Sequence, residues 1–495
     1  MVRKGVDDSM YRLSVLSSSE ISLIFSRALD ILESRGILIY HDDALNILDK
    51  AGVKVDKRGR IAFIPEYIVN EALKKAPKSF KLYDRKRRSF LTIEEEQTYF
   101  VPGSSAMKYL DHDLKVKNPL TDDFIRFVKI VEMLECIHIQ GTSLVPADCP
   151  SMIADRYRLY LLLKLSMKPI VTGTFTIDGT EDMIKMLSII RGSYDDLAKY
   201  PYAIFVCCVS PPFKWSDITM KSLITCSRYS VPVSILPMPQ IGLTSPGTVA
   251  SSILQHVAEF LSGLVISQLI NPGTPILFGG SVGALDPRTG VNLLGAPEVL
   301  LSTLGYNDVA KWLNIPSHAF LGISDSLTLD MQSILESSYQ LTIGTIAGIN
   351  IIQGPGMLES EITQNIEKLI LDNEICKIAL RLKRGIEIND ETLAIEIFKS
   401  VEPGAEYIKN PLILKYMIKW IPKEILLTKP VINRYTRSTW KTKGAKNIDQ
   451  RIKELIDEKL KSYSVEPLPE DKAKALDEVI VEAAKKHKVN IPKLI

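Results

Sequence analysis

Residues 203–236 read AIFVCCVSPPFKWSDITMKSLITCSRYSVPVSIL, a segment in which two apolar runs flank a stretch with helical spacing. The runs at 203–209 and 231–236 are short and rich in Val, Ile, Phe and Leu, as is typical of strands buried on both faces. Between them, residues 218–229 place apolar side chains at the spacing of a helix. The order of strand, helix and strand predicts one unit of a parallel sheet.

The same alternation continues in both directions along the chain. Similar apolar runs predict further strands at 98–102, 137–144, 169–176, 275–279, 317–322 and 349–353. Helical patterns separate most of them, at 152–165, 180–191, 249–270, 297–313, 329–347 and 361–382. Eight strands with crossover helices predict an α/β fold of the (β/α)8 type, a TIM barrel, over residues 98–385.

A doubly wound open sheet is the alternative to the barrel. Such a sheet usually carries a glycine-rich phosphate-binding turn after an early strand. The chain contains neither G-x-G-x-x-G nor G-x-x-x-x-G-K-[ST], so we favour the barrel.

The segments on either side of the barrel have different patterns. Residues 1–97 combine three short helical patterns with a predicted hairpin at 80–93, which indicates an N-terminal α+β cap. After residue 385 the strand signal ends, and residues 386–495 are predicted to form a C-terminal helical extension.

Composition limits the possible partners. Lys and Arg number 61 against 58 Asp and Glu, a net charge of +3, whereas a dedicated nucleic-acid binder is usually strongly basic. The N-terminus lacks the apolar run of a secretory signal, and the longest apolar stretch, near 260–270, is shorter than the roughly 20 residues that a membrane span needs. The six cysteines have no repeated spacing that would indicate a disulfide framework. We expect a cytoplasmic protein that has no nucleic-acid or membrane partner.

Candidate site residues are those at or beyond the carboxyl ends of the predicted strands, where TIM barrels place their chemistry. Those singled out are Phe205, Phe278, Arg288, His318, Phe320, Asp325, Gln353 and Glu359. Neither two facing carboxylates, as in a glycosidase, nor a strand-end lysine, as in a Schiff-base aldolase, stands out. The set therefore suits a neutral or cationic substrate and a reaction that needs little proton transfer.

A metal site bound by the chain itself is not expected. The six histidines form no H-E-x-x-H motif, and the sequence contains no C-x-x-C. Cys207 and Cys208 are adjacent, and neighbours on a strand point to opposite faces, so we expect one in the barrel and the other against a helix.

Four motifs occur in an order that resembles the trimethylamine methyltransferase (MttB-like) family. They are LDPRTG at 285–290 with GAPE at 295–298; GISDS at 322–326 with LDMQ at 329–332; GMLES at 356–360 with LDNEI at 371–375; and a tail with Trp420, Trp440 and EPLP at 466–469. Each motif alone is weak, but the four together cover nearly the whole chain.

The resemblance implies a TIM-barrel methyltransferase that moves a methyl group from a methylated amine to the cobalt of a corrinoid (cobalamin) carried by a separate partner protein. The sequence contains no pyrrolysine, so it looks like the branch of the family that acts on quaternary amines such as glycine betaine. The resemblance also implies a homo-oligomer.

Roles for the candidate residues follow from that chemistry. A quaternary ammonium already carries its charge, so the protein has mainly to position the reactants and manage charge. We expect Phe205, Phe278 and Phe320 to hold the cation and His318 and Gln353 to line its site. Glu359 and Asp325 would offset its charge as the catalytic residues, and Arg288 would bind a substrate carboxylate.

Two other functions remain open from the sequence. One is a zinc-dependent TIM-barrel methyltransferase that acts on a thiol or an alcohol. The other is a non-catalytic homologue that binds the corrinoid protein without turnover.

Overall fold

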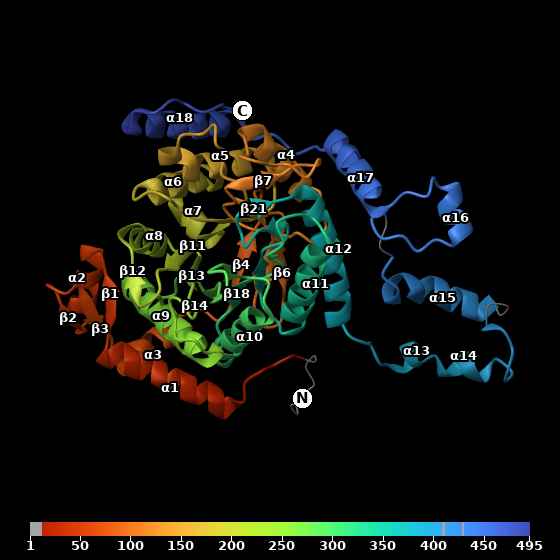
Figure 1. Cartoon of the computed structure of the whole chain (residues 1–495), viewed down its shortest axis with the longest axis horizontal. Helices are drawn as coiled ribbons and strands as arrows, with labels where there is room; N and C mark the ends of the chain where they lie inside the picture. Colours follow the sequence, from red (N-terminus) through yellow and green to blue (C-terminus); the bar gives the residue numbers. More distant parts are fainter. Residues whose placement is uncertain (1–11, 408–410, 428–429) are drawn as a thin grey trace.

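A barrel of eight parallel strands forms the centre of the computed structural model, which describes residues 12–407, 411–427 and 430–495 (Figure 1). Around the barrel the strands follow the order β6, β19, β18, β15, β13, β11, β10, β9, and every pairing between them is parallel. Their bounds are β6 Tyr99–Val101, β9 Gln140–Gly141, β10 Ile170–Thr172, β11 Ala203–Val209, β13 Val233–Pro237, β15 Ile276–Gly280, β18 Ser317–Phe320 and β19 Ile351–Gln353.

The first and last strands of this sheet meet, which distinguishes the barrel from an open sheet. The backbone N–H groups of His138 and Ile139 donate to the carbonyl of Phe100, at 3.0 and 3.2 Å. A second parallel bridge joins Ala106 to Leu144 farther along. The predicted TIM barrel is therefore confirmed, and the doubly wound sheet is not formed.

One helix follows each barrel strand and packs outside it, as the crossover rule requires. These helices are α4 Thr121–Glu132, α5 Ala154–Leu165, α6 Gly179–Arg191, α8 Asp217–Arg228, α9 Val249–Ile270, α10 Pro297–Trp312, α11 Met331–Ile346 and α12 Ile366–Lys383, with η1 Ser151–Ile153 before α5 and the short α7 Tyr194–Lys199 after α6. Side-chain caps begin several of them; the Asn365 side chain, for example, accepts the N–H of Lys368 at the start of α12.

Helix α9 is, within the described residues, the one helix long and apolar enough to cross a membrane. In this fold 78% of its most apolar 18-residue window is buried. It packs against β13 and β15 on one side and against α1, α3, α8 and α10 on others, so its apolar character is accounted for by packing.

The elements before β6 pack on the outside of the barrel and on its amino-terminal end. They are α1 Ser18–Ser34, β1 Ile37–Ile39, α2 Asp42–Lys50, β2 Lys54–Asp56, β3 Ile61–Phe63, α3 Glu66–Lys75, β4 Phe80–Tyr83 and β5 Phe90–Ile93. Strands β1, β2 and β3 form a small sheet that β12 (Lys214–Trp215), from the loop after β11, completes. The predicted hairpin at 80–93 is the antiparallel pair β4–β5.

The β4–β5 hairpin closes the amino-terminal end of the barrel. Leu82 and Ile93 of the hairpin pack in one buried cluster with Ile139, Val171, Ile204, Leu277 and Ile351 of the barrel strands. This cluster also identifies which side chains of each strand face inward, because successive residues alternate between the two faces.

The opposite, carboxyl end of the barrel carries two small sheets built from its loops. One contains β14 Gln240–Ile241, β16 Gly283–Leu285 and β17 Asn292–Leu293. The other contains β20 Met357–Leu358, β21 Thr363–Gln364, β7 Lys108–Leu110 and β8 Val116–Lys117. They fix the loops that follow β13, β15, β19 and β6 and so shape the mouth of the barrel.

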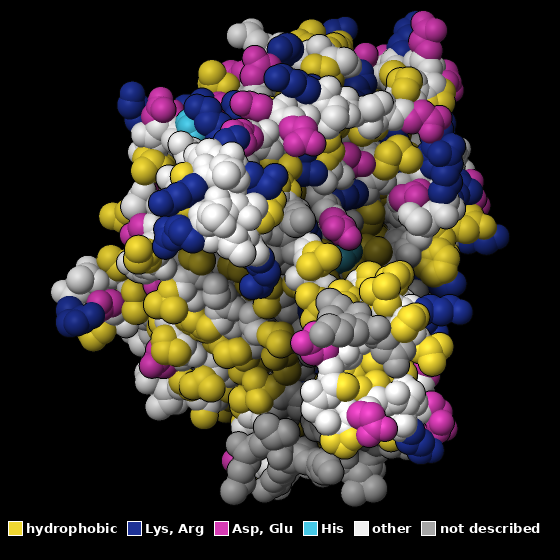
Figure 2. All heavy atoms as spheres, turned by 90° about the vertical axis from the view of Figure 1, so that its right-hand side faces the viewer, with side chains coloured by type: hydrophobic (Ala, Val, Ile, Leu, Met, Phe, Trp, Pro, Cys, Tyr) yellow, Lys and Arg dark blue, Asp and Glu magenta, His cyan; other side chains and the backbone are white. Residues whose placement is uncertain are grey.

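The chain after α12 is helical in most of its described part. Its helices are α13 Asp390–Leu393, α14 Ile395–Lys399, α15 Pro411–Glu424, α16 Arg437–Thr442, α17 Ile448–Ser462 and α18 Glu470–His487. Helix α18 returns to pack on α5 and α6, whereas α13–α16 stand away from the barrel in Figure 1. Phe398, Leu412 and Ile418 on these helices are exposed, and Figure 2, which views this side, shows hydrophobic side chains among charged ones.

Candidate active site

The part of the barrel interior nearest the carboxyl end contains a polar group of three side chains, Ser234, His318 and Gln353. The alternation set by Leu277 and Ile351 places them on the inner face of β13, β18 and β19. The Ser234 hydroxyl lies 2.8 Å from His318 Nδ1. The two residues reach each other across Gly279 of β15, where a Cβ atom would lie 2.3 Å from the Ser234 oxygen. A glycine is therefore required at this position of β15.

The imidazole of His318 is neutral at physiological pH. Burial lowers its pKa to about 3, and the Gln353 side chain opposes the shift only in part. His318 Nε2 and Gln353 Oε1 are buried, and neither has a hydrogen-bond partner within the described part of the chain. The ring of Phe320, two residues along the same face, lies 5.4 Å from the imidazole and is partly exposed toward the mouth. Three predicted residues, His318, Phe320 and Gln353, are thus brought together.

Asp325 and Glu359, predicted as catalytic residues, lie beside the mouth and hold its loops in place. Asp325 Oδ1 accepts hydrogen bonds from the Leu294 N–H at 2.8 Å and the Ser360 hydroxyl at 2.7 Å. Its Oδ2 accepts from the Gly295 N–H at 2.9 Å. Glu359 Oε2 accepts from the Thr363 hydroxyl at 2.6 Å. Both carboxylates therefore have protein donors already.

The turn between β20 and β21 presents a carboxyl group that the sequence analysis did not identify. Glu359, Ser360 and Glu361 all have positive φ, at 52°, 48° and 77°, and a non-glycine residue in such a conformation costs about 1–3 kcal/mol. Burial raises the pKa of Glu361 to about 8, and its charge in turn raises the pKa of Cys208. Cys208 follows the inward-facing Val206 on the same face of β11, so Glu361 lies over the barrel interior.

Glu361 was not among the predicted site residues because its position was predicted to be the start of a helix at 361–382. In the structure α12 begins at Ile366, capped by Asn365, and residues 357–364 form the β20–β21 hairpin instead. Polar residues at 359–361 directly after a buried strand are a signal of a turn, and this signal could have revealed the hairpin.

Arg288 lies on the β16–β17 hairpin and its side chain is 85% exposed. Its guanidinium forms two bonds with Asp286, with Nε at 3.0 Å from Oδ1 and Nη2 at 2.9 Å from Oδ2. Hydrogen bonding from Arg288 lowers the pKa of Asp286 to about 2. The pair stabilises the hairpin, and the structure does not place Arg288 among the inward-facing groups.

Phe205 and Phe278 lie on the outer face of the barrel wall, away from the mouth. Their neighbours Ile204 and Leu277 face inward, so the alternation turns both rings outward. The Phe278 ring lies 3.8 Å from that of Phe260 and 5.5 Å from that of His256, both on α9. The predicted role of these two residues in cation binding is not supported by this placement.

We expect Phe278→Ala to destabilise the protein by about 3–5 kcal/mol, because it removes a fully buried ring from between β15 and α9. Phe320→Ala removes a partly exposed ring and is expected to cost less. Urea unfolding followed by circular dichroism measures both losses. A Phe278→Ala variant as stable as the wild type would show that its ring does not pack as described.

Arg158 is a second group that the sequence analysis missed. It is fully buried on α5, where its Nη1 donates to the Ser105 hydroxyl at 3.0 Å and to the Thr142 carbonyl at 2.8 Å. Its guanidinium lies 4.2 Å from the centre of the Phe175 ring, and burial lowers its pKa to about 10. The sequence signal for Arg158 was a pair of arginines, Arg156 and Arg158, in the first turns of a helical pattern whose second half is mainly apolar.

The two adjacent cysteines divide as predicted. Cys207 is buried in the outer core, whereas Cys208 is inward-facing and partly exposed. Burial raises the pKa of both thiols to about 12, so both are protonated at physiological pH. Among the residues that the structure describes, no group of three or more His, Cys, Asp or Glu side chains has the geometry to hold a metal ion.

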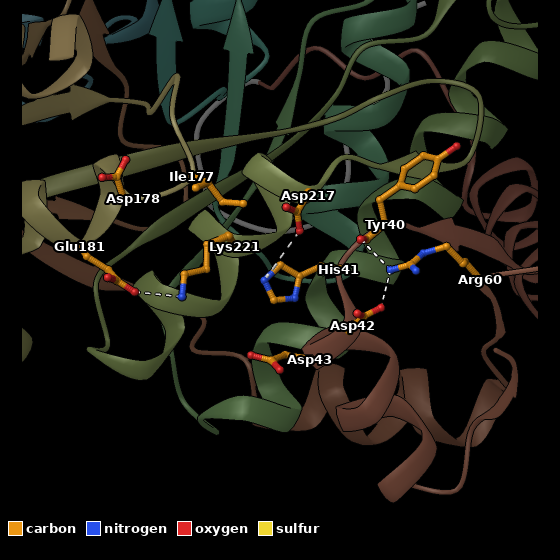
Figure 3. A pocket seen from close by; sticks show the side chains of 10 residues that line it. All are labelled: Tyr40, His41, Asp42, Asp43, Arg60, Ile177, Asp178, Glu181, Asp217 and Lys221. Carbon is orange, nitrogen blue, oxygen red and sulfur yellow. Dashed lines mark hydrogen bonds and ion pairs between the residues drawn. The ribbon is translucent and has the colours of Figure 1, made fainter. Parts of the chain in front are cut away.

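A cavity of about 630 Å³ lies on the flank of the barrel, where the N-terminal sheet meets α6 and α8 (Figure 3). Four of its charged groups form two pairs, one on each side of the cavity: Arg60 with Asp42 at 2.6 Å and Lys221 with Glu181 at 2.9 Å. Burial lowers the pKa of His41, against the opposing effect of Asp217. None of the eight predicted site residues lines this cavity, so we place the candidate site at the barrel mouth.

Known proteins resemble this chain along most of its length. Two relatives are trimethylamine methyltransferase MttB of Desulfitobacterium hafniense, 27% identical over 97% of this chain and 96% of the relative, and MttB of Methanosarcina barkeri, 27% identical over 96% of each. A glycine betaine methyltransferase of Desulfitobacterium hafniense is 26% identical over 80% of this chain and 83% of its own.

A solved structure supports the fold. The monomethylamine methyltransferase MtmB of Methanosarcina barkeri superposes with a TM-score of 0.53 at 14% identity, over 84% of this chain and 89% of its own. The family model for trimethylamine methyltransferase (MTTB) matches residues 2–489. This chain therefore belongs to the trimethylamine methyltransferase family.

Proposed function

We propose that this protein transfers a methyl group from a quaternary methylated amine, such as glycine betaine, to the Co(I) of a corrinoid carried by a separate protein. Family membership over residues 2–489 supports a methyltransferase. The names of its relatives, which include a trimethylamine and a glycine betaine methyltransferase, support a methylated amine as the donor.

The observation that carries this proposal is the composition of the barrel interior nearest the carboxyl end. The partly exposed ring of Phe320 stands beside a neutral imidazole and an amide, those of His318 and Gln353. An aromatic face attracts an ammonium cation without donating a proton to it. A quaternary ammonium needs no proton transfer, because its nitrogen leaves as a neutral tertiary amine.

The corrinoid of the partner protein would supply the nucleophile: the electron pair of Co(I) would form the bond to the methyl carbon, and the carbon–nitrogen electron pair would leave with the amine. Two hydroxyl groups could meet the corrinoid where it approaches: Ser104 and Ser105, just after β6, are partly exposed at the mouth. Such groups can hydrogen-bond to the amide side chains that surround a corrin ring.

The residues of the chain itself would position the donor. Phe320 would contact the methyl groups, and His318 and Gln353 would form the floor beneath them. The absence of charge on His318 and Gln353 would favour the reaction, since a cation and an electron-rich nucleophile both lose charge in the transition state.

The test presents purified protein and Co(I) cobalamin with glycine betaine, carnitine, choline, tetramethylammonium and trimethylamine in turn. We expect at least one quaternary amine to convert the Co(I) absorbance to that of methyl-Co(III), with release of the tertiary amine. Two results would favour the alternatives. Stoichiometric zinc with activity on a thiol or an alcohol would indicate the zinc-dependent transferase. Tight binding of a corrinoid protein without turnover of any amine would indicate the non-catalytic homologue.

We also propose that the protein acts as a homo-oligomer. The exposed apolar side chains of α13–α15, among them Phe398 and Ile418, support this proposal, because they lie on helices that stand away from the barrel and could pack against a second copy.

A further inference from the structure

The turn between β20 and β21 is a strained segment with a defined position. Three successive non-glycine residues, Glu359, Ser360 and Glu361, adopt left-handed backbone conformations. Such conformations persist only where surrounding contacts enforce them, and they cluster at functional sites. The turn is therefore built to place a particular side chain.

The contacts that enforce the turn come from the loop after β18. The Glu359 N–H donates to the Ser326 carbonyl at 2.9 Å, and the Ser360 N–H donates to the Ser324 carbonyl at 3.0 Å. The Ser360 hydroxyl donates to Asp325 Oδ1. The same loop follows β18, the strand that ends at Phe320. The turn that carries Glu361 is therefore hydrogen-bonded to the segment that follows Phe320.

The side chain that this turn holds over the interior is incompletely satisfied. Glu361 Oε1 is buried and, within the described residues, accepts no hydrogen bond. The residue as a whole is partly exposed, in the turn beside the mouth of the barrel. By contrast, Glu359 Oε2 and both carboxylate oxygens of Asp325 accept hydrogen bonds from protein donors.

A permanent ammonium cation is the ligand that such a carboxyl group suits. Its methyl groups offer no N–H donor, so it needs a carboxylate that is not already committed to other donors and an aromatic face nearby. An amine with N–H groups would select fixed acceptors with directed hydrogen bonds instead. Glu361 provides the carboxyl group, and Phe320 presents an aromatic ring to the same barrel interior.

We infer that Glu361 is the residue that recognises the positive charge of the methyl donor, by binding its methylated ammonium group at the mouth of the barrel. This inference rests on the proposed function for its substrate class. The reaction itself needs no further reactant for this step, because Glu361 binds the donor and forms no bond with it.

The affinity for the cation should then depend on pH. The titratable groups around Glu361 are Cys208 on β11, Glu359 in the same turn and Asp325 in the loop after β18. The Cys208 thiol, with a pKa of about 12, stays neutral between pH 6 and 9. Burial raises the pKa of Glu361 to about 8, so only its ionised fraction can bind the cation, and apparent affinity falls by about tenfold per pH unit below 8.

The experiment titrates the full-length protein with tetramethylammonium chloride by calorimetry at pH 6, 7, 8 and 9, without any corrinoid. For the wild type we expect the dissociation constant to fall by about tenfold per unit up to pH 8 and then to level off. tert-Butanol, an uncharged molecule of similar size, should show no such dependence.

Three variants complete the test. Glu361→Gln keeps the size of the side chain and is expected to weaken tetramethylammonium binding at pH 8 by at least about tenfold and to abolish the pH dependence. Glu361→Asp keeps the charge and should retain the dependence with weaker binding. Glu33→Gln, an equal change of charge on the exposed face of α1, should bind as the wild type does. Circular dichroism checks that each variant is folded.

The inference is overturned if the wild type does not bind tetramethylammonium, or if folded Glu361→Gln binds it within twofold of the wild type at pH 8. Because this assay contains no methyl acceptor, its result is separate from that of the proposed function. Methyl transfer by a Glu361→Gln variant with unchanged affinity would leave the proposed function standing and remove Glu361 from it.

Discussion

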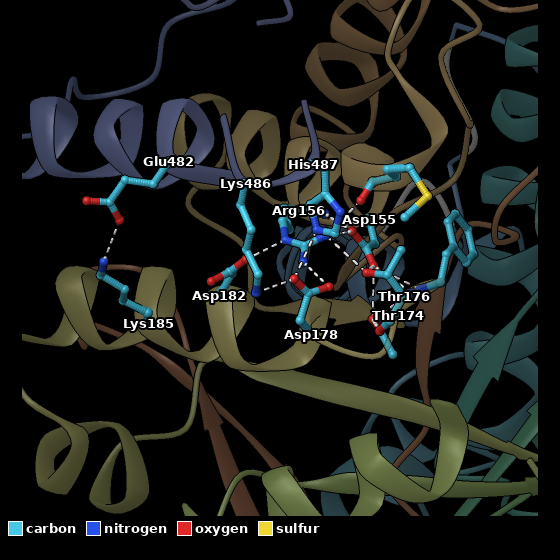
Figure 4. Close-up of polar contacts among 12 residues, drawn as sticks. Asp155, Arg156, Thr174, Thr176, Asp178, Asp182, Lys185, Glu482, Lys486 and His487 are labelled. Atoms are coloured by element: carbon cyan, nitrogen blue, oxygen red, sulfur yellow. Dashed lines mark hydrogen bonds and ion pairs between the residues drawn. The ribbon is translucent and has the colours of Figure 1, made fainter. Parts of the chain in front are cut away.

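Replacing Arg156 with methionine is expected to lower the free energy of unfolding by about 3–5 kcal/mol, because it leaves the fully buried Asp155 without its cation and removes one cation from Asp178 and Asp182. The Arg156 side chain is fully buried. Its nitrogens lie 3.2 Å from Asp155, 2.6 Å from Asp178 and 2.6 Å from Asp182 (Figure 4). Methionine fills a similar volume, so the loss would reflect charge rather than a cavity.

The effect should spread beyond α5, since the same carboxylates tie together three parts of the chain. Asp155 Oδ2 accepts the Thr174 hydroxyl and the Phe175 N–H, both at 2.9 Å, and so fixes the loop after β10. Asp178 receives Lys486 and His487 from α18, at 2.6 and 2.9 Å. Loss of Arg156 is therefore expected to loosen both this loop and the C-terminal helix.

Guanidinium unfolding followed by fluorescence measures the loss, and hydrogen exchange locates it. Lys185→Met is the matched control, because Lys185 pairs with Glu482 at 3.0 Å while both side chains are largely exposed, at 46% and 68%. An exposed pair contributes only about 0–1 kcal/mol. Equal losses for Arg156→Met and Lys185→Met would contradict the burial described here.

The dependence of the free energy of unfolding on acidic pH is a second test of the same cluster. Burial alone would raise the pKa of Asp178, but Lys486, Arg156 and His487 hold this pKa well below its ordinary value. Its ionised form therefore stabilises the native state above the ordinary carboxyl range, and this contribution is lost as the pH falls toward the lowered pKa. Between pH 4 and pH 2 we expect Arg156→Met to lose less additional stability than the wild type.

The sequence predicted the barrel because its strands and helices differ in period. Strand β11 has the predicted bounds, and the strands predicted at 317–322 and 349–353 appear as β18 and β19. The strand predicted at 137–144 is reduced to the pair Gln140–Gly141 with bridges at Ile137 and Leu144. It lies where the barrel closes, and closure depends on contacts between distant segments that a local pattern does not contain.

Part of the candidate site could be proposed from the sequence. His318, Phe320 and Gln353 were identified because polar and aromatic side chains at strand ends are informative in a barrel. Phe205 and Phe278 were misplaced because alternation separates two faces of a strand without indicating which one is inside; only packing with the β4–β5 hairpin and α9 decides it. Glu361 was missed because hydrogen bonds from a distant loop, at 324–326, impose the turn that presents it.

Asp325→Asn is expected to lower kcat/KM for the best methyl donor by about 100-fold, although Asp325 does not contact the donor in this proposal. Its two oxygens accept three hydrogen bonds, from Leu294, Gly295 and Ser360. An asparagine of the same shape must turn its NH₂ group toward at least one of these donors, which costs about 1–3 kcal/mol. The β20–β21 turn would then shift and move Glu361 from its position.

Binding measurements separate this positioning role from a direct catalytic one. If Asp325 acts through the turn, Asp325→Asn should weaken tetramethylammonium binding, and its effect should largely disappear in the Glu361→Gln background, because residues that act through one another are not additive. Ser360→Ala removes only one of the three hydrogen bonds and should cause a smaller loss, near 1 kcal/mol. If Asp325→Asn instead lowers kcat while cation affinity is unchanged, Asp325 acts directly on the reacting groups, as the sequence first indicated.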